Sequence, residues 1–202
     1  MASLVVSGDT SGAITLSAPA VAGTNTLSLP AVTDTLVGLA ATQTLTNKSI
    51  AATQLTGTIA VARLPTGSVL QVVSTQSQSA EISTSSVSYV TTGISASITP
   101  TSATSKILIL LSCTLDNQAS GRQMVITFYK GATDLASTRG TNQLYSDGGR
   151  VQASGSCMYL DSPATTSSTT YTVYFRSTTG GNTVKFANDN TMTSFTLMEI
   201  AG

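Results

Sequence analysis

A short repeat near the N-terminus is the feature that most constrains how this chain folds. Residues 15–24 (TLSAPAVAGT) return eleven positions later as residues 26–35 (TLSLPAVTDT), in a stretch that ends at Lys48 and contains no aromatic residue. Each unit reads as one short strand closed by a proline turn, and a unit of this size encloses no core of its own. We therefore expect neighbouring copies or other chains to cover its apolar side, which favours an assembled, elongated object over a monomeric enzyme.

The aromatic residues divide the 202-residue chain into two regions. All ten, from Tyr89 to Phe195, lie in the second region, so we expect a compact core only from about residue 69 onward. The chain is rich in Ser, Thr and β-branched residues, and it is 41% hydrophobic and 9% charged, which favours strands and a folded chain. We predict an all-β protein with three parts: an N-terminal β-repeat attachment region (1–50), a short stalk or connector (51–68) and a C-terminal β-sandwich or jelly-roll knob (69–202).

The knob region shows strand-like runs separated by turn clusters, at a spacing typical of sandwiches and jelly rolls. The predicted strands are 69–74, 86–91, 94–99, 106–115, 122–130, 150–161, 169–177, 183–187 and 194–201. The run 106–115 (KILILLSCTL) is almost continuously apolar, which is typical of a strand buried on both faces, so we expect it to be the central strand. Recognition residues are expected in the longest polar loops, at 116–121, 139–149, 162–168 and 178–182.

The stalk carries only a narrow apolar stripe. Leu55, Ile59 and Leu64 are separated by small or polar residues at spacings that fit neither a helix nor a strand well. A short amphipathic helix and an extended segment are both compatible with this pattern, and we favour the extended form. Because the stripe has too little apolar area for a single chain, we expect three or more chains to bury these residues against their own copies around an axis.

The residues that most catalytic and metal sites need are missing. The chain has no histidine, and Cys113 and Cys157 lack metal-ligand spacing, so we interpret them as buried free thiols, with a disulfide between adjacent strands as the alternative. Glycoside hydrolysis needs only two carboxylates, but no pattern fixes such a pair. We interpret the acidic residues of the knob as solvated loop residues: Glu81, Asp116, Asp134, Asp147, Asp161, Asp189 and Glu199. We expect no enzyme activity, no catalytic or metal-binding residues and no cofactor.

Charge and hydropathy limit the partners further. The formal net charge is zero and the nine basic residues are not clustered, which argues against nucleic acid as a partner. No run approaches the length of a membrane span, so we expect no membrane insertion. The first residues lack the basic start of a secretion signal, and we expect the chain to be made and assembled in a cytoplasm.

Several segments resemble tail-fibre-like virion proteins of tailed bacteriophages. Their N-terminal repeat region is similar to residues 12–50 (GAITLSAPAVAGTNTLSLPAVTDTLVGLAATQTLTNKSI), and the connector before their β-structured knob is similar to residues 55–73 (LTGTIAVARLPTGSVLQVV). Their C-terminal domain is similar to residues 98–113 (ITPTSATSKILILLSC) and 195–202 (FTLMEIAG). The resemblance implies a homotrimeric virion fibre, assembled in the host cytoplasm, whose N-terminal region docks on other phage tail or capsid proteins and whose knob faces the host.

We therefore expect a structural tail fibre that adheres to a glycan or protein of the host cell surface, with several weak contacts adding up through multivalency. The host-contact candidates lie in or beside long loops, and Tyr and Arg contribute disproportionately to interface energy: Arg122, Arg139, Tyr145, Asp147 and Arg150. Alternatively, Arg122 and Arg150 pair with carboxylates on the strands. Because the chain and its stalk are short, a capsid fibre, decoration or tail collar component with a purely architectural role is the alternative function. A polysaccharide depolymerase ranks third.

The stalk interpretation makes the first testable prediction. Replacing Leu55 or Ile59 with Asp places a charge where copies converge, and we expect this change to dissociate the oligomer. Sedimentation should give a mass near three times 20.5 kDa for the unaltered protein and near 20.5 kDa for either variant. Unchanged assembly of both variants would show that the stalk stripe is not an interface.

Overall fold

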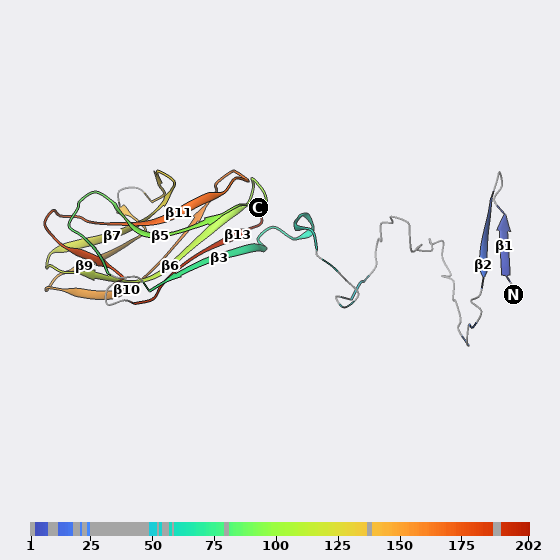
Figure 1. The fold of residues 1–202 in the computed structure, drawn as a ribbon, viewed down its shortest axis with the longest axis horizontal. Helices are drawn as coiled ribbons and strands as arrows, with labels where there is room; N and C mark the ends of the chain where they lie inside the picture. Colours follow the sequence, from blue (N-terminus) through green and yellow to red (C-terminus); the bar gives the residue numbers. More distant parts are fainter. Residues whose placement is uncertain are drawn as a thin grey trace. The chain divides into compact units, whose positions relative to one another are not determined.

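A computed structural model gives the fold of the chain (Figure 1). It describes residues 3–7, 12–17, 21, 24, 49–51, 53, 57, 59–78, 81–136, 139–187 and 191–202. The chain divides into two compact units, Met1–Thr56 and Gly57–Gly202, and each is described by itself. The described residues form antiparallel strands, turns and a 3-10 turn, without an α-helix among them. The all-β prediction is therefore confirmed.

The first unit contains a two-stranded hairpin. Strands β1 (Ser3–Ser7) and β2 (Ala13–Ser17) pair antiparallel, and β2 contains the start of the first repeat unit, where we expected a short strand. Val5 and Val6 are both more than half exposed. The second copy of the repeat, residues 26–35, lies outside the described residues. A hairpin of this size is marginally stable alone in water, which agrees with the expectation that it needs cover.

The second unit is a sandwich of two antiparallel sheets, drawn as a lower and an upper layer in Figure 1. The β6 sheet contains, in spatial order, β3 (Val69–Ser77), β13 (Thr193–Ile200), β6 (Lys106–Asn117), β12 (Val184–Phe186) and β4 (Ile82–Thr84), with β10 (Val151–Asp161) also paired to β6. The β7 sheet contains β5 (Val90–Ile98), β11 (Thr169–Ser177), β7 (Arg122–Lys130) and β8 (Thr133–Asp134), with β9 (Asn142–Ser146) also paired to β7.

The core lies between these two sheets, because alternate side chains of each strand point inward. From the β6 sheet come, among others, Ile107, Ile109, Leu111 and Leu197, all 2% exposed or less; from the β7 sheet come Met124, Ile126, Tyr171 and Val173, all fully buried. Two aromatic contacts bridge the sheets: Phe128 with Phe195 at 5.9 Å between ring centroids, and Phe175 with Phe186 at 6.0 Å. Five of the ten aromatic residues thus lie in the compact core expected after residue 69: Phe128, Tyr171, Phe175, Phe186 and Phe195.

Strand β6 is the central strand, as predicted. It pairs with β10 along one edge, and with β13 and then β12 along the other. The prediction that both of its faces are buried is wrong. Leu108 and Leu110 alternate with the buried core residues and are only half-buried, because no described element of the chain covers the outer side of this sheet.

Two further predictions on the strands are wrong. Residues 86–91 do not form a separate strand, because β5 starts at Val90 and continues to Ile98 through a β-bulge at Gly93, whose φ is +74°. The predicted loop 139–149 contains β9, which pairs with the first half of β7. In both cases the extent of the strand is set by its pairing with a strand that is distant in the sequence, and not by the local turn residues.

The described part of the stalk contains bends, a 3-10 turn at Val61–Arg63 and a turn closed by a 3.1 Å hydrogen bond from the Ser68 nitrogen to the Pro65 carbonyl, so it is not one continuous extended segment. Ile59 is 53% exposed, Leu64 is half-buried, and Leu55 lies outside the described residues. Two backbone hydrogen bonds of 2.8 Å join Gly67 and Ser68 to Ala201, so the connector is tied to the end of β13. The connector therefore enters the sandwich at one fixed end of the β6 sheet.

The cysteines are buried free thiols on adjacent strands, as interpreted from the sequence. Burial raises the pKa of Cys113 to about 12 and that of Cys157 to about 11. Burial also raises the pKa of Tyr171, and so does Asp161, which accepts a 2.7 Å hydrogen bond from the Tyr171 hydroxyl. The folded protein therefore holds three acidic protons more tightly than the unfolded chain does.

This proton retention predicts that the protein loses stability in alkali. The unfolded chain releases these protons near the ordinary pKa values and the folded chain does not, so the free energy of unfolding should fall as pH rises from about 9 to about 11, by about 1.4 kcal/mol per pH unit for each group. Urea unfolding over this range measures the slope. The double variant Cys113→Ala, Cys157→Ala should give a shallower slope, and an equal slope in both proteins would contradict the prediction.

Candidate functional site

Four of the five predicted host-contact residues meet at the end of the sandwich opposite the connector. Arg122 begins β7 and pairs with the last residue of β9, while Tyr145, Asp147 and Arg150 lie on β9 and in the turn before β10. Arg139 lies apart from them, in the loop before β9, where its carbonyl accepts a hydrogen bond from Gln143. We call the loops around Arg122 and residues 145–150 the distal end.

At the distal end, Arg150 is held by a buried carboxylate. Its Nη2 lies 2.5 Å and its Nε 3.0 Å from Oδ2 of Asp116, which is fully buried, while half of the Arg150 side chain is exposed. This bidentate geometry satisfies the buried charge. The alternative interpretation, pairing with a strand carboxylate, is therefore confirmed for Arg150.

A network of buried amides fixes the distal loops. Asn117 donates a 2.7 Å hydrogen bond to the carbonyl of Arg122, and Asn182 donates a 3.1 Å bond to Oδ1 of Asn117. Ser120 donates a 2.6 Å bond to the carbonyl of Asp147. The network is only partly satisfied, since the buried Asn182 Oδ1 and Gln118 Nε2 have no hydrogen-bond partner among the described residues. Its bonds still tie the end of β6 to the start of β7 and to the turn after β9, close to the half-exposed Tyr145 ring.

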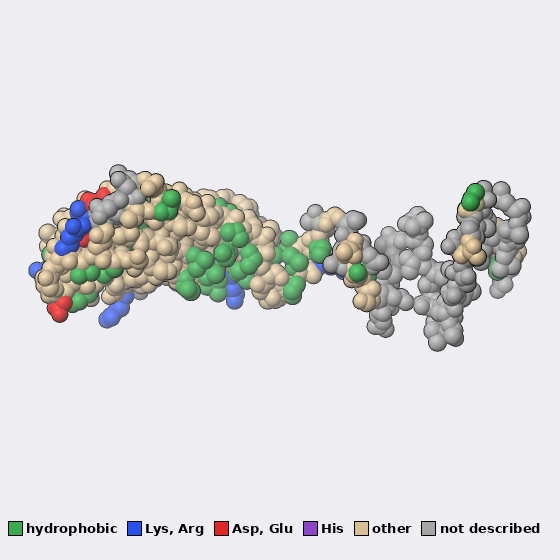
Figure 2. Space-filling model, turned by 90° about the horizontal axis from the view of Figure 1, so that it is seen from below, with side chains coloured by type: hydrophobic (Ala, Val, Ile, Leu, Met, Phe, Trp, Pro, Cys, Tyr) green, Lys and Arg blue, Asp and Glu red, His purple; other side chains and the backbone are tan. Residues whose placement is uncertain are grey.

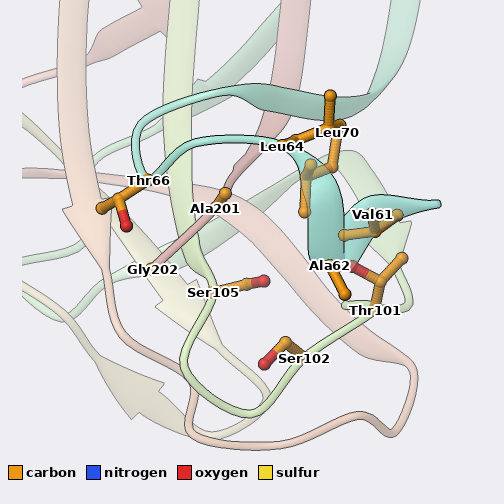
Figure 3. A pocket seen from close by; sticks show the side chains of 10 residues that line it. All are labelled: Val61, Ala62, Leu64, Thr66, Leu70, Thr101, Ser102, Ser105, Ala201 and Gly202. Atoms are coloured by element: carbon orange, nitrogen blue, oxygen red, sulfur yellow. The ribbon is translucent and has the colours of Figure 1, made fainter. Parts of the chain in front are cut away.

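At the opposite end, the connector and the base of the β6 sheet enclose a hollow of about 420 Å³ (Figure 3). Its lining side chains are all uncharged and come from the connector, β3, the turn before β6 and the end of the chain: Val61, Ala62, Leu64, Thr66, Leu70, Thr101, Ser102, Ser105, Ala201 and Gly202. Leu64, which we predicted to lie on an assembly axis, is one of them. The hollow offers hydroxyl and apolar contacts.

Beside this hollow, Glu199 joins three segments that are far apart in the sequence. Its carboxylate accepts hydrogen bonds from Gln71 on β3 at 2.6 Å and from the backbone and hydroxyl of Thr101 at 2.7 Å each. Burial alone would raise the pKa of Glu199, but these hydrogen bonds outweigh it and lower the pKa below its ordinary value. Glu199 is therefore a charged anchor at the base of the sandwich.

The interpretation of the acidic residues as solvated loop groups is wrong for three of them. Asp116, Asp161 and Glu199 lie on strands and are at most 6% exposed. Asp161 is paired with Lys130 at 2.9 Å. Sequence reasoning missed these sites because each partner lies in a segment that is distant along the chain. Asp189 lies outside the described residues.

Among the residues that the structure describes, no group of three or more acidic, Cys or His side chains could hold a metal ion. None of the described helical segments is long and apolar enough to cross a membrane.

The outer face of the β6 sheet carries a feature that sequence reasoning did not name. Val72, Met198, Leu108 and Leu160 form one row across β3, β13, β6 and β10. The next row brings Met158 beside Leu110, and Met158 is 68% exposed. Figure 2 shows hydrophobic side chains gathered on this side of the sandwich. We call these six residues the apolar face.

Comparison with protein-family models and with curated proteins finds no match for the chain.

The Glu199 anchor predicts a matched pair of stability effects. Glu199→Gln places amide hydrogens where three donors converge, and we expect a loss of about 1–3 kcal/mol in the free energy of unfolding at neutral pH. Because folding lowers the pKa of Glu199, its ionised carboxylate stabilises the fold at pH values above the ordinary pKa of 4.5, and this contribution is lost as the pH falls below that value. The unaltered protein should therefore lose more stability in acid than the variant does. Urea unfolding at neutral and acidic pH measures both effects. Asp147→Asn, at an exposed position, is the control and should change neither.

Proposed function

We propose that this protein is a homotrimeric virion fibre of a tailed bacteriophage. Its N-terminal region docks on other tail or capsid proteins, and its knob adheres to a glycan or protein of the host cell surface. The observation that carries this proposal is the apolar face of the β6 sheet, because burial of this face against further copies of the chain would stabilise an oligomer of the knob.

The apolar face has the character of a subunit interface. It spans four strands, and its two rows contain aliphatic side chains, Met, Ser and Thr but no charged residue. Soluble monomers rarely leave a large contiguous apolar patch exposed. Two apolar residues of the central strand, Leu108 and Leu110, gain full cover only if another molecule packs against this face.

A second copy of the same chain is the occupant that we infer. The connector is hydrogen-bonded to Ala201 at the base of the same sheet, and Val69 pairs there with Ile200, which extends the apolar surface towards the connector. If the connectors of several chains converge on an axis, as the narrow stripe of the stalk suggests, their β6 sheets converge with them. Continuity between stalk and apolar face therefore supports assembly through the whole unit.

The strand order supports the finer assignment of the knob as a jelly roll. In this arrangement eight strands form two sheets, and the connections pass from one sheet to the other. Here the eight long strands divide into β3, β13, β6, β10 and β5, β11, β7, β9. In a trimer built on the apolar face, the β7 sheet and the distal end of each copy stay outside and are available for adhesion.

One observation favours the architectural alternative, a capsid fibre, decoration or tail collar component that binds no host molecule. Arg150, a leading contact candidate, is engaged by Asp116, which leaves the distal end with fewer free polar groups. Binding of the purified trimer to host cells discriminates the two functions. Retained binding supports the adhesive fibre, and its absence supports the architectural role.

The apolar face predicts where a charge disrupts assembly. Met158→Asp and Leu160→Asp place a carboxylate in the proposed interface, and we expect each to dissociate the trimer, because an unpaired buried charge is strongly unfavourable. Ser154→Asp is the matched control, since Ser154 is exposed on the same face of β10 but pairs with Thr114 beyond the apolar rows. Sedimentation measures the mass of all three variants. A monomeric unaltered protein, or equal assembly of all three variants, would contradict the proposal.

A further inference from the structure

Three tyrosines gather on the outer face of the β7 sheet, away from the predicted contact residues of the distal end. Tyr129 on β7 and Tyr174 on β11 have ring centroids 4.1 Å apart, with 31° between the ring planes. Tyr89, just before β5, meets Tyr129 edge-on at 6.1 Å. All three side chains are half-buried, so part of each remains open to solvent. We call them the tyrosine cluster.

A positive and a negative group flank the cluster. The Arg176 guanidinium carbon lies 5.0 Å from the centroid of the Tyr89 ring, a cation–π distance. Asp134 pairs with Tyr129 across β7 and β8, and its negative charge adds to burial in raising the pKa of Tyr129. The cluster thus combines aromatic rings with one guanidinium and one carboxylate.

Asp134 is held in one orientation by hydrogen bonds to a single oxygen. Its Oδ1 accepts bonds from the Thr127 hydroxyl at 2.5 Å and from the backbone nitrogen of Ala136 at 3.1 Å. The other oxygen, Oδ2, has no hydrogen-bond partner among the residues that the structure describes. A carboxylate fixed in this way keeps one acceptor ready for a ligand, without the cost of ordering it on binding.

Hydroxyl groups surround the cluster on the same face. Ser97 and Thr170 share a 2.7 Å hydrogen bond, and Thr91 and Ser95 are exposed on β5. Closer to β9, the face is covered by the chain itself, since the segment around Gly140 buries Val125. The uncovered part of the β7 sheet is therefore the part that carries the tyrosine cluster and these hydroxyl groups.

We propose that the tyrosine cluster binds an uncharged hexose unit of a cell-surface glycan. The C–H face of a pyranose ring packs on an aromatic ring, while its hydroxyl groups need hydrogen-bond acceptors and donors at the rim. Asp134 Oδ2 supplies an acceptor, and the Arg176 guanidinium, whose Nη1 donates a 3.3 Å hydrogen bond to the Val87 carbonyl, supplies the positive charge of the site. Because these two charges balance, the site matches a neutral sugar better than an anionic one.

The inference rests on the proposed function, since an adhesive fibre whose β6 sheets pack against one another would present the β7 sheet to a cell-surface glycan. It deepens that function by naming a ligand class and by moving the expected contact from the distal end to the side of the knob. Tyr145, the exposed tyrosine of the distal end, has no ring contact with the cluster among the described residues.

The test is binding of the purified full chain to an array of bacterial cell-surface oligosaccharides that contains neutral and anionic members. We expect binding to at least one neutral hexose glycan. Tyr174→Leu keeps most of the packing volume but removes the aromatic face, and it should weaken binding about tenfold or more. Asp134→Asn keeps an acceptor for Thr127 and should weaken binding to a similar degree. Gln143→Leu, at an exposed position of β9 on the same sheet, should leave binding unchanged.

Folding and assembly are measured on the same samples by urea unfolding and sedimentation. Absence of binding to every neutral member, or unchanged binding by folded Tyr174→Leu and Asp134→Asn, overturns the inference. Cell adhesion that persists in both variants overturns the inference but leaves the proposed fibre function intact. A protein that is monomeric and does not adhere to cells overturns the proposed function. In that case the array still tests whether the tyrosine cluster binds a neutral sugar.

Discussion

The fold depends on one strand that is paired along both edges and apolar on both faces. Strand β6 joins β10 on one side to β13 and β12 on the other, and its inward residues, such as Ile107 and Ile109, contribute to the centre of the core. The β7 sheet covers this inner face, but the described chain has nothing left to cover the outer one. The same strand that stabilises the single sandwich therefore leaves it with an incompletely buried surface.

The two outer faces differ in a way that follows from this constraint. The outer face of the β6 sheet has rows of Val, Leu and Met, whereas that of the β7 sheet has Ser and Thr with a few tyrosines and is partly covered by its own loop. Apolar area favours contact with another apolar surface, and hydroxyl groups favour water or polar ligands. This asymmetry supports an assembly in which one sheet faces sister chains and the other faces the surroundings.

Local pattern was enough to predict the all-β class, the central strand and the free thiols, because strand alternation and composition are local properties. It was not enough for the strand at 142–146 or the extent of β5, which are decided by pairing with β7 and β11. The acidic residues were misread for the same reason. Asp116 meets Arg150 34 positions away and Glu199 meets Thr101 98 positions away. Likewise, the tyrosine cluster joins residues from three strands or their ends, which no spacing along the chain reveals.

The buried charged groups of the sandwich have partners within the sandwich itself. The buried carboxylates Asp116 and Asp161 each have a cationic partner, and Glu199 is satisfied by hydrogen bonds. With a net charge of zero, the protein has little long-range electrostatic attraction to offer a partner. The proposed contacts between copies must then rely on shape and apolar area, and the proposed contacts with a ligand on short-range hydrogen bonds and ring packing. Such contacts are individually weak, so durable attachment requires several of them at once, which is what a fibre with repeated knobs provides.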